Sequence, residues 1–310
     1  MKIYKSIESV IGLREIVDSL LEKHSIVLPE SSRFHFYRDV FDNQYKNQYK
    51  DLFQLCKANN LSLDYLPFIY KEYYDFLYTL SKMLVLYESL GDLREKQTLL
   101  KKIKVTFKGA SFIEKEGEKN AFSEPRDTLF ELTVASQFYE IGLADIKFLE
   151  HPDVLVTNNG IKFGFECKRV RYYEKNNFIK RIESAVDQIC DYKQFHDIGI
   201  IAIDVSYLVT DGGKMNMDIN FEEFQKRSMA LMKDLCDEVE RKSNIFVKAT
   251  RQSKVFGIIL FSSGLVQFTN DFNAYANNYM RSYESINKTA GELFYNSFRN
   301  VIEKNPIITI

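Results

Sequence analysis

The first third of the chain carries hydrophobic residues at helical spacing. Between residues 7 and 21, apolar side chains recur every three or four positions, and residues 63–90 repeat the pattern with Tyr and Phe on the apolar face. Strand-like alternation bounded by turn residues does not occur in this part of the sequence. We therefore expect residues 1–110 to form an all-α domain.

The pattern changes after residue 110. A polar segment with Gly and Ser, residues 108–126, is typical of a linker or an exposed loop. Pro125 then opens a helical pattern that ends at Gly142, because Pro suits the first turn of a helix and Gly its C-terminal cap. We expect residues 111–310 to form an α/β domain.

Two short strand-like runs come next, residues 153–157 and 161–170. They are joined by Asn158-Asn159-Gly160, which is a strong hairpin signal. The later elements predicted are a helix at 177–192, a strand at 198–209, a helix at 221–241, a strand at 255–261 and a C-terminal helical region. This alternation favours a mixed sheet flanked by helices.

The composition is that of a soluble globular protein, with 45% hydrophobic and 27% charged residues. A membrane span is not expected, because no run of 18 apolar residues occurs. The first twenty residues carry charges throughout, unlike a signal peptide, so we expect a cytoplasmic protein. Four widely spaced cysteines without a CxxC pair predict neither disulfides nor structural zinc.

The charge balance restricts any nucleic-acid surface to a local patch, because 42 basic residues face 43 acidic ones. One basic cluster comprises Lys168, Arg169, Arg171, Lys175, Lys180 and Arg181. A second comprises Lys101, Lys102, Lys104 and Lys108, and it fits a solvated surface equally well.

Several common chemistries are excluded by their motifs. The sequence contains no P-loop, no GxGxxG and no GxSxG. The four histidines form no HExxH motif and no pair at helical spacing, so each is expected at the surface or in the core.

The predicted hairpin gathers charges of both signs. Glu166 and Lys168 are two residues apart and share one face of their strand, whereas Cys167 faces the other side. Pairing around the turn brings Asp153 alongside Glu166, and like charges in that position destabilise a sheet. A divalent cation bound by carboxylate oxygens would relieve the repulsion. The alternative is a surface hairpin whose charges are only solvated.

Two helices contribute further polar residues. Glu131 lies on a helix face that is otherwise apolar or small, where it meets a ligand or pairs with a lysine. In the later helix Arg181, Gln188 and Tyr192 share one face, which is also the pattern of an amphipathic helix with a polar flank.

The order Glu131, Pro152-Asp153, Glu166-Cys167-Lys168 and Gln188-x-x-x-Tyr192 resembles the PD-(D/E)XK nuclease superfamily, which has the restriction-endonuclease-like fold. The helix that carries Glu131 is similar to the first helix of Mrr-type members, and the Q-x-x-x-Y pattern is similar to that of RecB-type members. The resemblance covers residues 125–205 and leaves residues 1–110 unexplained.

The resemblance implies a nuclease that depends on Mg²⁺ or Mn²⁺. Asp153 and Glu166 would bind the metal together with the main-chain carbonyl of Cys167, and Glu131 would bind or orient a second metal. Lys168 would hold the attacking water. Gln188 and Tyr192 would position Lys168 or the nucleic-acid backbone. The residues that would bind nucleic acid are Arg169, Arg171, Lys175, Lys180, Arg181 and Tyr192.

DNA is favoured over RNA as the substrate, and a restriction-like or phage-defence role is expected. A homodimer would suit two coordinated cuts, and the helical domain would bind a protein partner or recognise the substrate. The alternative is a non-catalytic nucleic-acid-binding or assembly protein that retains the nuclease fold. A helical interaction module with an incidental hairpin would require Glu131 and Asp153 to lie far apart.

Overall fold

The computed structural model describes most of the chain. The described residues are 2–3, 7–45, 66–108, 124–140, 142, 145–170, 175–209, 216–217, 221–242, 255–268, 271–282, 292–293, 296 and 308–309. Most of the predicted linker and Arg171 lie outside these residues.

The N-terminal part is helical, as its periodicity predicts. Its helices are α1 (Ile7–Lys23), α2 (Arg33–Tyr45), α4 (Leu66–Ser89) and α5 (Leu93–Thr106). Helices α1 and α2 pack on α4, and both α4 and α5 pack on α6 (Glu124–Glu140). A short strand, β1 (Lys2–Ile3), departs from the all-helical expectation by pairing with β9 (Ile308–Thr309).

The predicted hairpin is confirmed, with its turn. Strand β3 (Val154–Asn158) pairs antiparallel with β4 (Ile161–Arg169), and β2 (Ile146–Phe148) pairs with β3 on the other side. Asn159 and Gly160 both have positive φ angles, 50° and 80°, as a two-residue type I′ turn requires. Val154 lies opposite Phe165, so the residue before it, Asp153, falls opposite Glu166.

Apart from the β1–β9 pair, the described strands form one mixed sheet. The further strands are β5 (Ile198–Asp204), β6 (Asn216–Met217), β7 (Val255–Phe268) and β8 (Asp271–Ser282). The order is β2-β3-β4-β5-β7-β6, and β8 also pairs with β7. Strands β4, β5 and β7 are parallel to one another, whereas β2–β3, β3–β4 and β7–β8 are antiparallel. The mixed α/β architecture expected from the sequence is therefore present.

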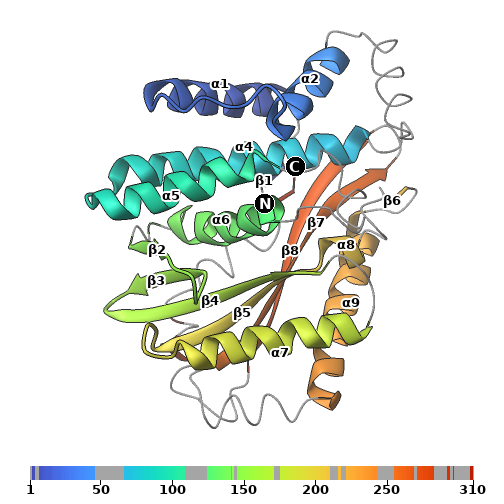
Figure 1. Cartoon of the computed structure of the whole chain (residues 1–310). Coiled ribbons are helices and arrows are strands. Elements are labelled where there is room, and N and C mark those ends of the chain that lie inside the picture. The colour runs from blue at the N-terminus through green and yellow to red at the C-terminus, as the bar shows by residue number, and fades with distance from the viewer. Residues whose placement is uncertain are drawn as a thin grey trace.

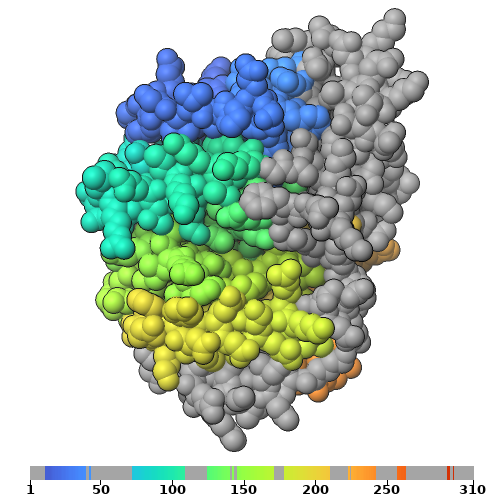
Figure 2. Space-filling view, viewed as in Figure 1, coloured from blue at the N-terminus to red at the C-terminus, as the bar shows by residue number. Residues whose placement is uncertain are grey.

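Helices cover both faces of this sheet (Figure 1). A core shared with α4, α5 and α6 contains Phe165 and Cys167, and a second core with α7 (Lys175–Asp191) and α9 (Phe221–Lys242) contains Ile201 and Ile203. Figure 2 shows the layers in the same order, from α1 and α2 through α4 and α5 to the strands and α7. The first core runs without interruption from the N-terminal helices to the sheet.

One predicted strand is too long, and the predicted C-terminal helical region is wrong at its start. The strand at 198–209 ends at Asp204, because the carboxylate of Asp204 accepts hydrogen bonds from the backbone and hydroxyl of Ser206, where the short helix α8 (Ser206–Val209) begins. The C-terminal helical region begins instead with β8, which pairs with β7 along its whole length. Its Asn-rich sequence has little intrinsic strand preference, so the neighbouring strand decides its conformation.

Among the helices of the described ranges, none is both long enough and apolar enough to cross a membrane.

Candidate metal centre

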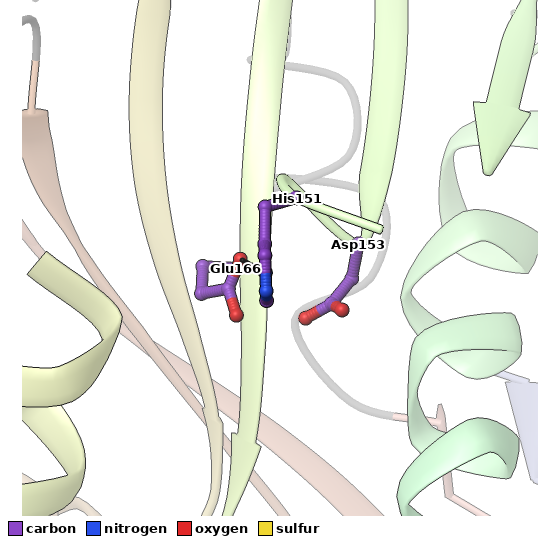
Figure 3. A group of neighbouring side chains, drawn as sticks. All are labelled: His151, Asp153 and Glu166. Atoms are coloured by element: carbon purple, nitrogen blue, oxygen red, sulfur yellow. Dashed lines mark hydrogen bonds and ion pairs between the residues drawn. The ribbon is translucent and has the colours of Figure 1, made fainter. Parts of the chain in front are cut away.

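Three side chains that can ligate a metal meet where the hairpin begins. One ligand atom each of His151, Asp153 and Glu166 lies within 4.8 Å of the others. His151 and Asp153 lie between β2 and β3, and Glu166 lies within β4. Figure 3 shows both carboxylates directed toward the imidazole ring, which lies between them in this view.

The hairpin register holds the carboxylate of Asp153 in place. The backbone N–H of Cys167 donates a hydrogen bond of 2.7 Å to Oδ2 of Asp153. The side chain of Cys167 points into the core formed with α4–α6, as predicted, and burial raises the pKa of its thiol well above the usual range. A role of its carbonyl oxygen as a ligand stays a prediction.

Glu166 is fully buried and has two partners. Nζ of Lys168 donates to Oε1 at 2.7 Å, and Nδ1 of His151 lies 3.3 Å from Oε2. A buried carboxylate is costly unless it is paired and hydrogen-bonded. The site is thus more than a set of solvated charges on a surface hairpin.

The electrostatics of the site favour a cation. Burial, and next the negative charge of Glu166, raise the pKa of Asp153 to about 7. Burial and a neighbouring negative charge both disfavour the ionised form of this carboxyl group. A positive ion bound beside it stabilises the ionised form.

Glu131 interacts electrostatically with Asp153 but is not part of the three-residue group. Burial, and next the charge of Asp153, raise the pKa of Glu131 to about 7. Its carboxylate forms an ion pair with Lys102 of α5, which is the alternative that the sequence left open. A role in binding a second metal stays a prediction.

Gln188 of α7 and Tyr192, directly after this helix, meet a different partner from the one expected. Nε2 of Gln188 lies 3.4 Å from Nε2 of His151, and the rings of His151 and Tyr192 are 5.0 Å apart. Both side chains therefore contact His151, whereas the sequence pointed to Lys168 or a nucleic-acid backbone.

His151 is the site residue that the sequence analysis missed. It was expected at the surface or in the core, because no second histidine lies at ligand spacing. Its only signal is its place directly before Pro152-Asp153. The structure brings it to Glu166 through the hairpin, which no local spacing rule describes.

The residues predicted to bind nucleic acid differ in their exposure and in their pairing. Arg169 is only 8% exposed and pairs with Asp127 and Asp204, so it is not presented to a ligand. Lys180 and Arg181 are exposed on α7. Lys175 begins α7, and its side chain lies outside the described part of the structure. In the second cluster Lys101, Lys104 and Lys108 are exposed, whereas Lys102 is paired with Glu131.

Neither a known protein family nor a curated protein matches the sequence.

Proposed function

We propose that the protein is a metal-dependent nuclease that hydrolyses phosphodiester bonds, with DNA as the expected substrate. The observation that carries this proposal is the meeting of Asp153, Glu166 and His151 within 4.8 Å, with the ammonium group of Lys168 at 2.7 Å from Glu166.

The donor set fits a hard or borderline divalent cation. Carboxylate oxygens suit Mg²⁺ and Mn²⁺, and an imidazole nitrogen adds a ligand that suits transition metals. Asp153 and Glu166 would supply the oxygens and His151 the nitrogen. When bound, such an ion lowers the pKa of water and neutralises charge on the phosphate.

Lys168 supplies the second positive charge. Its side chain is 14% exposed, and its ammonium group lies 2.7 Å from the buried Glu166. There it can donate hydrogen bonds to a water molecule or to a non-bridging phosphate oxygen, and it stabilises the negative charge that develops during hydrolysis.

Exposed cations are available for the phosphate backbone. Lys180 and Arg181 project from α7, the helix that also brings Gln188 to the site. Contacts of this kind hold nucleic acid without reading its sequence. The α/β framework is compatible with the PD-(D/E)XK fold, in which an acidic hairpin of this kind carries the active site.

The test is cleavage of linear duplex, supercoiled plasmid, single-stranded DNA and RNA, each with Mg²⁺, Mn²⁺ or EDTA. Cleavage that needs metal and falls to background in Asp153→Asn is the expected result. Asp187→Asn is the matched control, because Asp187 is exposed on α7 and outside the three-residue group.

The other outcomes also decide between functions. Metal-independent cleavage, or cleavage that survives Asp153→Asn, contradicts the proposed site. Nucleic-acid binding without cleavage of any substrate favours the non-catalytic alternative.

A further inference from the structure

In the described part of the structure, only the nitrogen end of the Gln188 amide has a partner, which is His151. Its amide Nε2 lies 3.4 Å from the ring Nε2, while its Oε1 is buried and has no hydrogen-bond partner among the described residues. A buried acceptor without a partner costs free energy, and such cases call for an explanation.

The amide orientation seen here, with Nε2 of Gln188 toward the ring, corresponds to one position of the imidazole hydrogen. An amide nitrogen only donates, so Nε2 of a neutral His151 must accept, and the hydrogen then lies on Nδ1. From Nδ1 it points at Oε2 of Glu166, 3.3 Å away. This tautomer is well bonded, but it offers no lone pair on the side of the two carboxylates.

A cation shared with Asp153 and Glu166 needs the other tautomer. Nδ1 is the ring nitrogen beside Glu166, so it would be the ligand, and the hydrogen would then lie on Nε2. Histidine ligands of metals almost always donate the other ring N–H to an acceptor. A half-turn of the Gln188 amide brings its Oε1 to Nε2 of His151. Oε1 of Gln188 then accepts the hydrogen on Nε2 of His151, so each of these two atoms has a partner.

We propose that Gln188 is a positioning residue of the metal centre, whose amide rotation selects the His151 tautomer that can bind metal through Nδ1. Because an amide has one donor and one acceptor end, Gln188 satisfies His151 in both states. Tyr192, whose ring centroid lies 5.0 Å from that of the imidazole, packs against the same ring. The inference rests on the metal-binding part of the proposed function and not on cleavage.

The first test is a double-mutant cycle read by calorimetric titration with Mn²⁺. Gln188→Met, which keeps the shape without the acceptor, should weaken Mn²⁺ binding by roughly 10–100-fold. In a His151→Ala background the same change should have almost no further effect, since the two residues act as one unit. Gln194→Met is the control, because Gln194 is exposed in the turn after α7.

The second test reads the tautomer directly in ¹⁵N NMR spectra of the intact chain. His151 should carry its hydrogen on Nδ1 without metal and on Nε2 with Zn²⁺, a diamagnetic ion that suits imidazole. In Gln188→Met the metal-free protein should keep the Nδ1–H form, because Glu166 still accepts that hydrogen, but reaching the Nε2–H form should take roughly 10–100-fold more Zn²⁺, because Nε2–H then has no acceptor. Thermal unfolding identifies a variant that has simply failed to fold.

These outcomes separate the two proposals. Equal losses of Mn²⁺ affinity in both backgrounds, or an unchanged tautomer with metal, overturn the role of Gln188 and leave the nuclease proposal intact. A wild-type protein that binds no Mn²⁺ overturns both, and metal binding with the predicted tautomers but no cleavage overturns only the nuclease.

Discussion

The imidazole of His151 gives the candidate centre a nitrogen donor beside two carboxylates. Carboxylates alone suit Mg²⁺, whereas imidazole suits transition metals, and Mn²⁺ accepts both kinds of donor. The mixed set should therefore bind Mn²⁺ more tightly than Mg²⁺.

The first prediction concerns this selectivity. His151→Ala should weaken Mn²⁺ binding by roughly 10–100-fold and Mg²⁺ binding much less. Calorimetric titrations of both proteins with both ions measure the two ratios. Equal losses for the two ions would show that the ring acts by packing and not as a ligand.

The second prediction separates Lys168 from the ligands. Lys168→Met should reduce cleavage by about 10²–10⁴-fold, because a charge that assists the reacting water is lost. Mn²⁺ affinity should hold or rise, since Glu166 no longer shares Oε1 with an ammonium group. Lys226→Met is the control, because Lys226 is exposed on α9. A large loss of metal affinity in Lys168→Met would contradict the assignment.

At the scale of single residues, the sequence predicts the features that follow from its periodicity. The period of two places Glu166 and Lys168 on one face, and their hydrogen bond confirms it. It does not say which neighbour a side chain meets, so His151 was missed and Arg169, bound to Asp127 and Asp204, was assigned to nucleic acid. Those contacts depend on elements distant in the chain.

Strand β4 supports the loop that carries the site through Gly164. A methyl group added there would lie 2.8 Å from Cγ of Pro152 and 2.9 Å from Cγ of His196. Pro152 stands between His151 and Asp153, so any outward movement displaces two candidate ligands together.

The third prediction rests on this close approach. Gly164→Ala should cost about 1–3 kcal/mol of unfolding free energy, as overpacking does, and should also weaken Mn²⁺ binding. Gly12→Ala is the control: nothing lies within 4 Å of its added carbon, and within α1 the change should stabilise by roughly 0.5–1 kcal/mol. Urea unfolding and calorimetry measure both variants. A Gly164→Ala protein with normal stability and metal affinity would mean that the loop adjusts freely.

Among the elements, those with local signals were predictable. The turn at Asn159-Gly160 and the periodic helices were found, because their chemistry lies within a few residues. Strand β8 was missed because its conformation depends on pairing with β7, and β5 was extended too far because the Asp204–Ser206 hydrogen bonds were not anticipated.

For the whole molecule, a buried polar network holds the N-terminal helices to α6. Arg126 of α6 donates to the carboxylate of Glu72 in α4 at 3.1 Å and to the hydroxyl of Tyr37 in α2 at 3.0 Å. Arg33 donates to the backbone oxygens of Thr106 and Pro125. Since α6 also packs on β3 and β4, the network supports the same helix that covers the site. The continuous core and this network both cross residue 110. The domain boundary proposed there stays a prediction.

The last prediction concerns acid stability. Burial alone would raise the pKa of Glu72, but the charges and hydrogen bonds of Arg126, with Arg33 and Tyr37, outweigh it and lower the pKa to about 2, from 4.5. A lowered carboxyl pKa stabilises the folded state above the unfolded value, so this contribution is complete above about pH 4.5 and disappears as the pH falls toward 2. It amounts to about 3 kcal/mol, at 1.36 kcal/mol per pKa unit.

Glu72→Gln should remove that dependence and leave Arg126 buried without its charge partner, a loss of about 3–5 kcal/mol at pH 7. The difference in unfolding free energy between wild type and Glu72→Gln, from urea unfolding at pH 7, 4 and 3, should therefore shrink as the pH falls. Glu22→Gln, at an exposed position of α1, should show no such trend. A difference that stays constant with pH would mean that Glu72 stabilises the helices by packing alone, and the network would then not link them to α6 through charge.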